Sequence, residues 1–167
     1  MSRKLCLVST EVGNLLVTQL AHELKNFNLY MSFANYFGVE GISDLEHYYR
    51  KRAAEEMLHH QWIMDYLTEA DFKFVYPQID HNTETFEDYV TPFRLTVDRE
   101  ILTTQMLYRI YEKTQLEKDL MTKIWLYEHL VKEQIEEENT SRMALTIMEE
   151  DSDIYIKADN VCDLLKS

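Results

Sequence analysis

Glycine, proline, cysteine and positive charge are all scarce in this chain. Its 167 residues include only 3 Gly, 2 Pro and 2 Cys, too few turn signals for a strand-rich fold, so a few long helices are favoured. Lys and Arg number 17 against 30 Asp and Glu, for a formal net charge of −13. Nucleic acids and anionic membranes both attract clustered basic residues, so neither is expected as a partner. With 46% apolar residues, residues 1–167 are predicted to form one all-α domain with one core.

Long apolar runs and paired cysteines are also missing. No run approaches membrane-spanning length, and residues 1–10 show no sustained apolar region or small-residue cleavage site. Cys6 and Cys162 stand alone without a CxxC pattern, which favours free thiols in a reducing compartment. The sequence therefore predicts a cytoplasmic protein.

The apolar pattern predicts four long helices and a short fifth one. Apolar residues recur at three- and four-residue steps along the first two segments. Ser9 or Thr10 is expected to cap the first helix, which ends at Gly38. Ser43 or Asp44 is expected to cap the second, which frays near residues 70–72. A turn of only a few residues joins the two, so they should lie antiparallel.

The second half of the chain carries less regular signals. After a connection over residues 71–83, Thr83 is expected to cap the third helix. Pro92 should then kink that helix or mark a ragged first segment. The fourth helix is predicted over about residues 116–148 and the fifth over 152–165. The inward face of the fourth is expected to carry Leu120, Ile124, Tyr127, Val131, Ala144 and Met148.

The length of the 71–83 connection favours one topology. Fully extended, it reaches about 40 Å, and a helix of nearly 30 residues is also about 40 Å long. The connection can therefore run the length of the bundle. This suits a four-helix bundle with one long crossover, with a loosely coiled loop as the alternative.

Every long helix breaks its apolar pattern with a carboxylate near mid-length. The inward polar positions are Glu23 in the first helix, Glu56 and His59 in the second, Glu100 in the third, and Gln134 and Glu137 in the fourth. Buried carboxylates must be protonated, paired with cations or bound to metal. Inward Lys and Arg are too scarce to pair them, Arg52 being the nearest candidate. The Glu56-x-x-His59 spacing places two ligands on one helical face, and this donor set suits iron or manganese.

Four motifs, in this order and spacing, resemble the ferritin family, specifically the bacterial non-haem ferritins. The motifs are His22-Glu23-Leu24 with Tyr30, Glu55-Glu56-Met57-Leu58-His59 followed by Asp65-Tyr66-Leu67-Thr68, Arg99-Glu100-Ile101 with Gln105, and Glu133-Gln134-Ile135-Glu136-Glu137-Glu138. The resemblance implies a ferritin-like di-iron domain that oxidises Fe(II) to Fe(III) with dioxygen or hydrogen peroxide. It also implies storage of ferric oxyhydroxide inside a homo-oligomeric shell, of 24 subunits by family resemblance.

The resemblance also implies roles for individual residues. Matching motif positions would give the first iron to Glu23, Glu56 and His59, with Glu56 bridging. Glu100 and Glu137 would hold the second iron.

Further positions match residues around the iron pair. Gln134 matches a glutamine near the second iron, and Tyr30 a tyrosine beside the pair. A third, weaker iron site would use Glu55, Glu133, Glu136 and Glu137. No haem is expected, because many non-haem ferritins also have a methionine at the position of Met57.

The last motif separates the alternatives. Bacterioferritins, rubrerythrins and related di-iron enzymes would carry a second Glu-x-x-His where this chain has Gln134-x-x-Glu137. Two other functions stay open. One is a ferritin-like bundle with a structural or regulatory role and little ferroxidase activity, and the other is a different di-iron carboxylate oxidase.

Overall fold

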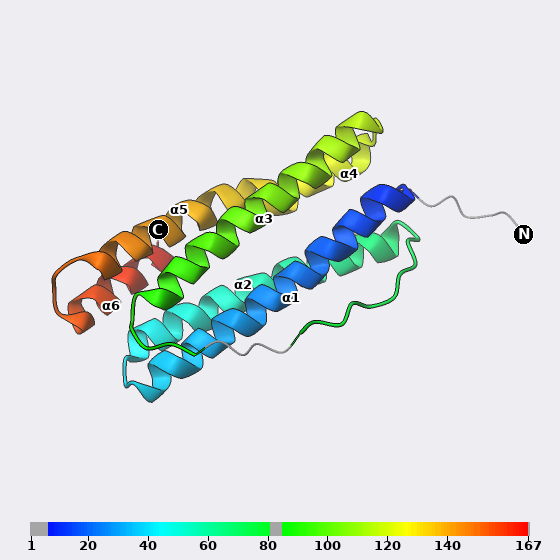
Figure 1. The fold of residues 1–167 in the computed structure, drawn as a ribbon. Coiled ribbons are helices and arrows are strands. Elements are labelled where there is room, and N and C mark those ends of the chain that lie inside the picture. The colour runs from blue at the N-terminus through cyan, green and yellow to red at the C-terminus, as the bar shows by residue number, and fades with distance from the viewer. Residues whose placement is uncertain (1–6, 81–84, 167) are drawn as a thin grey trace, which may run out of the picture.

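The chain folds as a four-helix bundle with a short C-terminal helix (Figure 1), in a computed structural model that describes residues 7–80 and 85–166. The all-α prediction is confirmed. The elements are α1 (Thr10–Val39), α2 (Ser43–Glu69), α3 (Thr91–Leu116), α4 (Leu120–Leu126), the π-helical turn η1 (Tyr127–Val131), α5 (Lys132–Glu149), α6 (Ile154–Asp163) and the 3-10 turn η2 (Leu164–Lys166). Among the described helices, none combines the length and the apolar character that crossing a membrane requires.

Helices α1 and α2 form an antiparallel pair joined by a tight turn. Ser9 caps α1 as expected, its side chain accepting from the backbone N–H of Val12 at 3.1 Å. Gly41 takes a φ of 77° in the turn, a conformation that costs glycine little. The expected cap on α2 is wrong. Ser43 is already helical, and Ile42 precedes it without a side-chain cap.

The crossover is longer than the sequence predicted. Helix α2 ends at Glu69 and α3 begins only at Thr91, and Figure 1 shows residues 70–80 of the connection running along the bundle. The expected cap Thr83 lies outside the described residues. Asp88 instead accepts from the backbone N–H groups of Val90 and Thr91 at 2.8 and 2.7 Å. Pro92 therefore sits in the first turn of α3, where its missing N–H costs nothing, and does not kink the helix.

The fourth long helix is interrupted, which makes part of its predicted inward face wrong. Ile124 and Tyr127 are 47% and 50% exposed, and Leu120 is exposed as well. Leu126 is buried instead, and Leu130 is buried as the inward seam of the fourth helix predicts. The wider turn of η1 rotates everything before it relative to α5, and such π-turns are frequent near functional sites.

The core consists of two apolar clusters separated by a polar layer. An aromatic cluster near the α1–α2 turn contains Tyr30, Phe33, Phe37, Tyr48, Tyr49 and Phe93. An aliphatic cluster toward the other end contains Leu16, Leu20, Ile63, Leu67, Leu107 and Ile110. The polar side chains between them are the candidate site.

Candidate metal centre

The predicted inward carboxylates are buried at one level of the bundle. Glu100 is 0% exposed, Glu23 1%, Glu56 2% and Glu137 7%. They come from α1, α2, α3 and α5, so each long helix contributes one. His59 is 3% exposed beside them.

Glu23, Glu56 and His59 form what we call the acid–histidine group. One ligand atom from each residue lies within 4.8 Å of the other two. The Oε2 atoms of Glu23 and Glu56 and the Nε2 atom of His59 have no hydrogen-bond partner among the described residues. Gln19, one turn before Glu23, donates to the other carboxylate oxygen of Glu23 at 2.6 Å.

The acid–histidine group fits a divalent cation. Buried polar atoms without partners are rare because each loses its hydration without compensation. Here three such atoms, two carboxylate oxygens and one imidazole nitrogen, converge from two helices. Oxygen and imidazole donors of this kind suit iron and manganese.

The pKa values of the site residues also show that the metal-free site carries too much negative charge. Burial raises the pKa of Glu56 well above its usual value, and the negative charges of Glu23 and Glu100 raise it further. Burial also raises the pKa of Glu137 from 4.5 to about 7, although Arg52 and His59 oppose the rise. Burial lowers the pKa of His59, but contact with Glu133 and the charge of Glu137 outweigh it and bring the value to about 9. Without metal, the raised pKa values favour protonation of these residues, and the bound protons offset part of the negative charge that a metal cation would otherwise balance.

A second set of side chains, the arginine group, lies next to the first. It consists of Arg52, Glu100, Glu137, Tyr30 and Gln134. Arg52 Nη2 donates to Glu100 Oε1 at 2.6 Å, and Tyr30 donates to the same oxygen at 2.6 Å. Gln134 donates to Glu100 Oε2 at 2.9 Å. Both oxygens of Glu100 are therefore occupied by donors within the protein.

Arg52 also reaches the other acids of this half. Its Nη1 lies 3.6 Å from Glu137 Oε1 and 3.4 Å from Glu55 Oε2. Burial lowers the pKa of Arg52, but Glu100 and Glu137 raise it well above its ordinary value, so the guanidinium stays charged. The expectation that basic residues are too scarce to pair the buried carboxylates is wrong at Glu100 and Glu137. It holds at Glu23 and Glu56, to which no Lys or Arg ion pair is found in the described part of the chain.

An acidic cleft of about 350 Å³ opens beside the arginine group, between α2, α5 and the C-terminal turn. Its lining includes the four residues predicted for a third iron, Glu55, Glu133, Glu136 and Glu137. Glu133 Oε2 lies 3.5 Å from His59 Nε2, and together with Glu137 they form a second group of convergent ligand atoms. Glu136 is exposed and Glu55 half-buried on the wall of the cleft.

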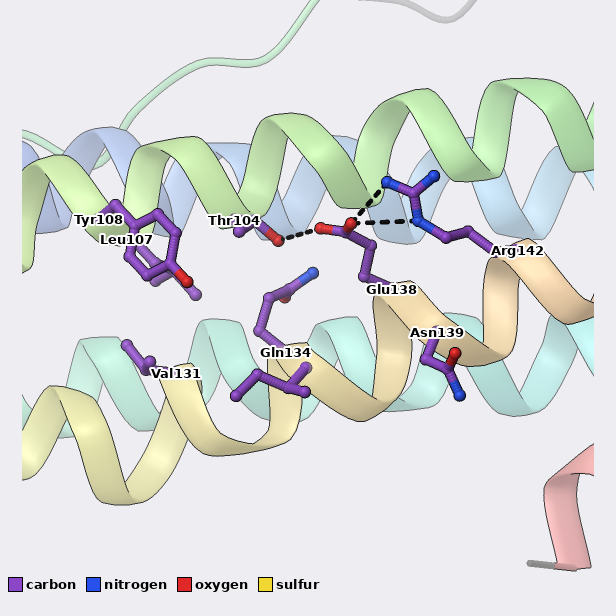
Figure 2. Close-up of a pocket in the computed structure, with 9 residues that line it drawn as sticks. Thr104, Leu107, Tyr108, Val131, Gln134, Glu138, Asn139 and Arg142 are labelled. Atoms are coloured by element: carbon purple, nitrogen blue, oxygen red, sulfur yellow. Dashed lines mark hydrogen bonds and ion pairs between the residues drawn. The ribbon is translucent and has the colours of Figure 1, made fainter.

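A second cavity, of about 460 Å³, lies between α3 and α5 (Figure 2). Glu138 occupies its wall, accepting from Thr104 at 2.6 Å and from Arg142 at 2.7 Å. Gln134 extends from α5 toward α3 within this cavity. Because Gln134 also donates to Glu100, it is the member of the arginine group that lines this cavity.

Comparison with known proteins agrees with the helical bundle and identifies its family. Residues 13–150 match the ferritin-like domain. The chain belongs to this family. It is 27% identical over 136 residues to a bacterial non-heme ferritin of Bacteroides fragilis strain 638R, covering 81% of this chain and 85% of that protein. It is 26% identical over 134 residues to one of Staphylococcus haemolyticus strain JCSC1435, covering 80% of each. The resemblance stated from the motifs is therefore confirmed.

Solved structures give the same fold for this ferritin-like chain. A humanized archaeal ferritin superposes with a TM-score of 0.86 at 22% identity, covering 95% of both chains. An open-pore ferritin from the hyperthermophilic archaeon Archaeoglobus fulgidus gives 0.84 at 22% identity, covering 93% of this chain and 98% of that one. The four-helix bundle with a short C-terminal helix is thus a ferritin architecture.

Two residues of the ferritin-like site escaped the sequence reasoning. Gln19 was missed altogether, and Arg52 was named only as the nearest cation. Each stands four residues before a predicted ligand, Gln19 before Glu23 and Arg52 before Glu56. Residues four apart share a helical face, so this spacing is the signal that could have placed both side chains in the site.

Proposed function

We propose that this protein is an iron-storage ferritin that oxidises Fe(II) at a ferroxidase centre within each subunit. The observation that carries the proposal is the acid–histidine group, in which three unpartnered ligand atoms converge inside a ferritin-like bundle. The similarity to proteins named bacterial non-heme ferritin supports iron as the metal. Iron is the substrate and the stored product, so the site must take it up and release it.

In this proposal the buried residues divide between two iron positions. Glu23, Glu56 and His59 hold the first Fe(II), with Glu56 shared between both ions. Glu100 and Glu137 hold the second. Carboxylates serve both oxidation states, since hard oxygen donors bind Fe(II) and stabilise Fe(III) further.

The reaction balances with two iron ions. Each Fe(II) gives one electron to dioxygen, which takes up two protons and leaves as hydrogen peroxide. Hydrogen peroxide can in turn take two electrons from two further Fe(II) ions, together with two protons, to give two molecules of water. The Fe(III) product hydrolyses, releases protons and is stored as ferric oxyhydroxide.

The remaining site residues have supporting roles in the proposal. Tyr30 and Gln134 orient Glu100 by donating to its two oxygens. Glu55, Glu133 and Glu136, with Glu137, form a weaker third iron site in the acidic cleft. The whole chain acts as one ferritin-like domain in a cytoplasmic homo-oligomeric shell, of 24 subunits by family resemblance.

One observation favours a second candidate function, a ferritin-like bundle with little ferroxidase activity. Arg52 forms ion pairs with Glu100 and Glu137 without any metal. A bundle stabilised in this way can keep its fold and assembly without oxidising iron.

Aerobic Fe(II) oxidation, together with the particle mass by size-exclusion chromatography, distinguishes the two functions. The proposal predicts a large assembly with fast oxidation that Glu56→Ala abolishes. His59→Ala should slow the first fast phase while leaving the assembly intact. Glu69→Ala, on the exposed end of α2, is the matched control and should oxidise iron like the wild type. A monomer or dimer without site-dependent oxidation would contradict the proposal.

A further inference from the structure

Arg52 occupies an unusual place in the bundle. It is 3% exposed and is the only lysine or arginine buried among the described side chains. Its guanidinium lies 5.9 Å from the centre of the Tyr30 ring and between acids of three helices, Glu55, Glu100 and Glu137. A buried cation of this kind is stable only because it is paired with these acids.

The acids that hold Arg52 are the ones assigned above to the second iron. Both oxygens of Glu100 are engaged, one by Arg52 and Tyr30 and the other by Gln134. A divalent ion entering here would compete with a guanidinium for the same oxygens and would be repelled by its charge. The acid–histidine group faces no competing Lys or Arg among the described residues, and its ligand atoms have no hydrogen-bond partner there. The contacts that His59 Nε2 does make are with the carboxylates of Glu133 and Glu137, at 3.5 and 3.8 Å.

We propose that Arg52 is a built-in counter-cation of the second metal position, which a second divalent ion must displace. The inference rests on the proposed function, since it takes Glu100 and Glu137 as ligands. Metal binding is then sequential, with a first ion at Glu23, Glu56 and His59 and a weaker second ion.

The acidic cleft provides space and partners for the displaced Arg52 guanidinium. The acidic cleft of about 350 Å³ begins at Arg52 itself and continues to Glu133 and Glu136. Arg52 Nη1 is already 3.4 Å from Glu55, on the wall of this cleft. Rotation of the side chain would therefore exchange the buried pair with Glu100 for more solvated pairs with Glu55, Glu133 and Glu136, which keeps Arg52 charged and partnered.

Calorimetric titration with Zn²⁺, which has no redox chemistry, tests the inference. The wild type should bind one Zn²⁺ per subunit tightly and a second about tenfold more weakly or worse, with any ion in the acidic cleft binding more weakly still. Glu56→Gln should remove the first event and Glu100→Gln the second, which assigns each event to its half of the site. Arg52→Gln should strengthen the second event by about tenfold and leave the first within about twofold.

Two further variants make the test specific. Lys51→Gln removes a positive charge from the same cleft and should leave both Zn²⁺ affinities unchanged. Arg52→Lys keeps the charge on a single ammonium that cannot bridge the acids as a guanidinium does. Its affinity for the second Zn²⁺ should lie between those of the wild type and Arg52→Gln. This variant replaces Arg52→Gln in the test if Arg52→Gln does not fold.

The outcomes separate this inference from the proposed function. If Glu56→Gln leaves both Zn²⁺ events intact, the assignment of the centre is wrong and the inference falls with it. If Glu56→Gln and Glu100→Gln act as stated but neither Arg52 variant strengthens the second event, only the displacement by metal is overturned.

Discussion

The acid–histidine group and the arginine group are neighbours in the same polar layer, yet they solve the problem of buried charge in opposite ways. One ligand atom each of Glu23, Glu56 and His59 has no hydrogen-bond partner among the described residues. The two oxygens of Glu100 accept from Tyr30, Arg52 and Gln134. Without metal, the first half therefore has only the proton of His59 to balance its acids, and the second carries a permanent cation, Arg52.

This contrast predicts opposite effects of substitutions on the metal-free protein. Removing a partner from the arginine group leaves a buried charge without compensation and should destabilise the fold. Removing a charge from the acid–histidine group relieves repulsion and should stabilise it. Four variants test these statements, from the largest effect to the smallest.

The largest effect is expected for Arg52→Gln. The substitution leaves Glu100 and Glu137 without their cation, so the free energy of unfolding of the metal-free protein should fall by about 3–5 kcal/mol. Urea denaturation in the presence of EDTA measures it. Lys51→Gln, in the lining of the same cleft, is the control. It removes one hydrogen bond, from Lys51 to the Leu165 carbonyl at 2.8 Å, and should change stability by about 1 kcal/mol or less. Equal effects of the two variants would show that Arg52 is not needed to balance the buried acids.

The second prediction concerns pH. The pKa of Glu137 is raised from 4.5 to about 7 in the folded protein, so folding favours its protonated form. The stability it contributes is present below pH 4.5 and lost as the pH rises through 7. Relative to Glu137→Gln, the metal-free wild type should therefore lose about 3 kcal/mol of unfolding free energy across that window. Parallel stability curves for the two proteins between pH 4.5 and 8 would refute the cause given for this shift.

Tyr30→Phe should have a smaller effect. It removes the hydroxyl that donates to Glu100 at 2.6 Å while keeping the ring in the aromatic cluster. Because Arg52 and Gln134 still donate to Glu100, we expect a loss of about 2 kcal/mol, typical of a hydrogen bond to a charged group. Tyr36→Phe, a half-buried tyrosine on the same helix, is the matched control. A loss no larger than that of the control would mean that the hydroxyl adds nothing to the arginine group.

The smallest effect has the opposite sign. Glu56→Gln should raise the stability of the metal-free protein at pH 8 by about 1 kcal/mol, because it removes a buried acid that Glu23 and Glu100 repel. The same variant should lose the rise in melting temperature that Zn²⁺ gives the wild type. Thermal unfolding with and without Zn²⁺ measures both. If Glu56→Gln destabilises the metal-free protein, the claim that the two groups respond oppositely to loss of a charge is wrong.

The sequence predicts the parts of this site that depend on spacing within a helix. Glu56 and His59 share a face because they stand three residues apart, and Glu23 and Glu100 interrupt apolar patterns that are themselves buried. The helical bundle follows from the same periodicity and from the scarcity of glycine and proline, and the crossover from the length of the connection after the second helix. These features need only local geometry.

Features that depend on packing between helices were not predictable in the same way. Arg52 reads as one of three basic residues in a row, Arg50 to Arg52, and only the approach of α3 and α5 shows that it pairs with Glu100 and Glu137. The π-turn η1 rotates the inward face of α4 relative to that of α5, and its sequence contains no glycine or proline that would predict the change. The start of α3 depends on Asp88, which accepts from the backbone N–H of Thr91. From the sequence alone, Thr83 was an equally suitable cap.

An anomalous-scattering map of crystals soaked anaerobically with less than one Fe(II) per subunit tests the central claim most directly. The account predicts a single iron peak bound by Glu23, Glu56 and His59, with Arg52 still on Glu100. A first peak between Glu100 and Glu137, or equal peaks in both halves at this loading, would contradict it.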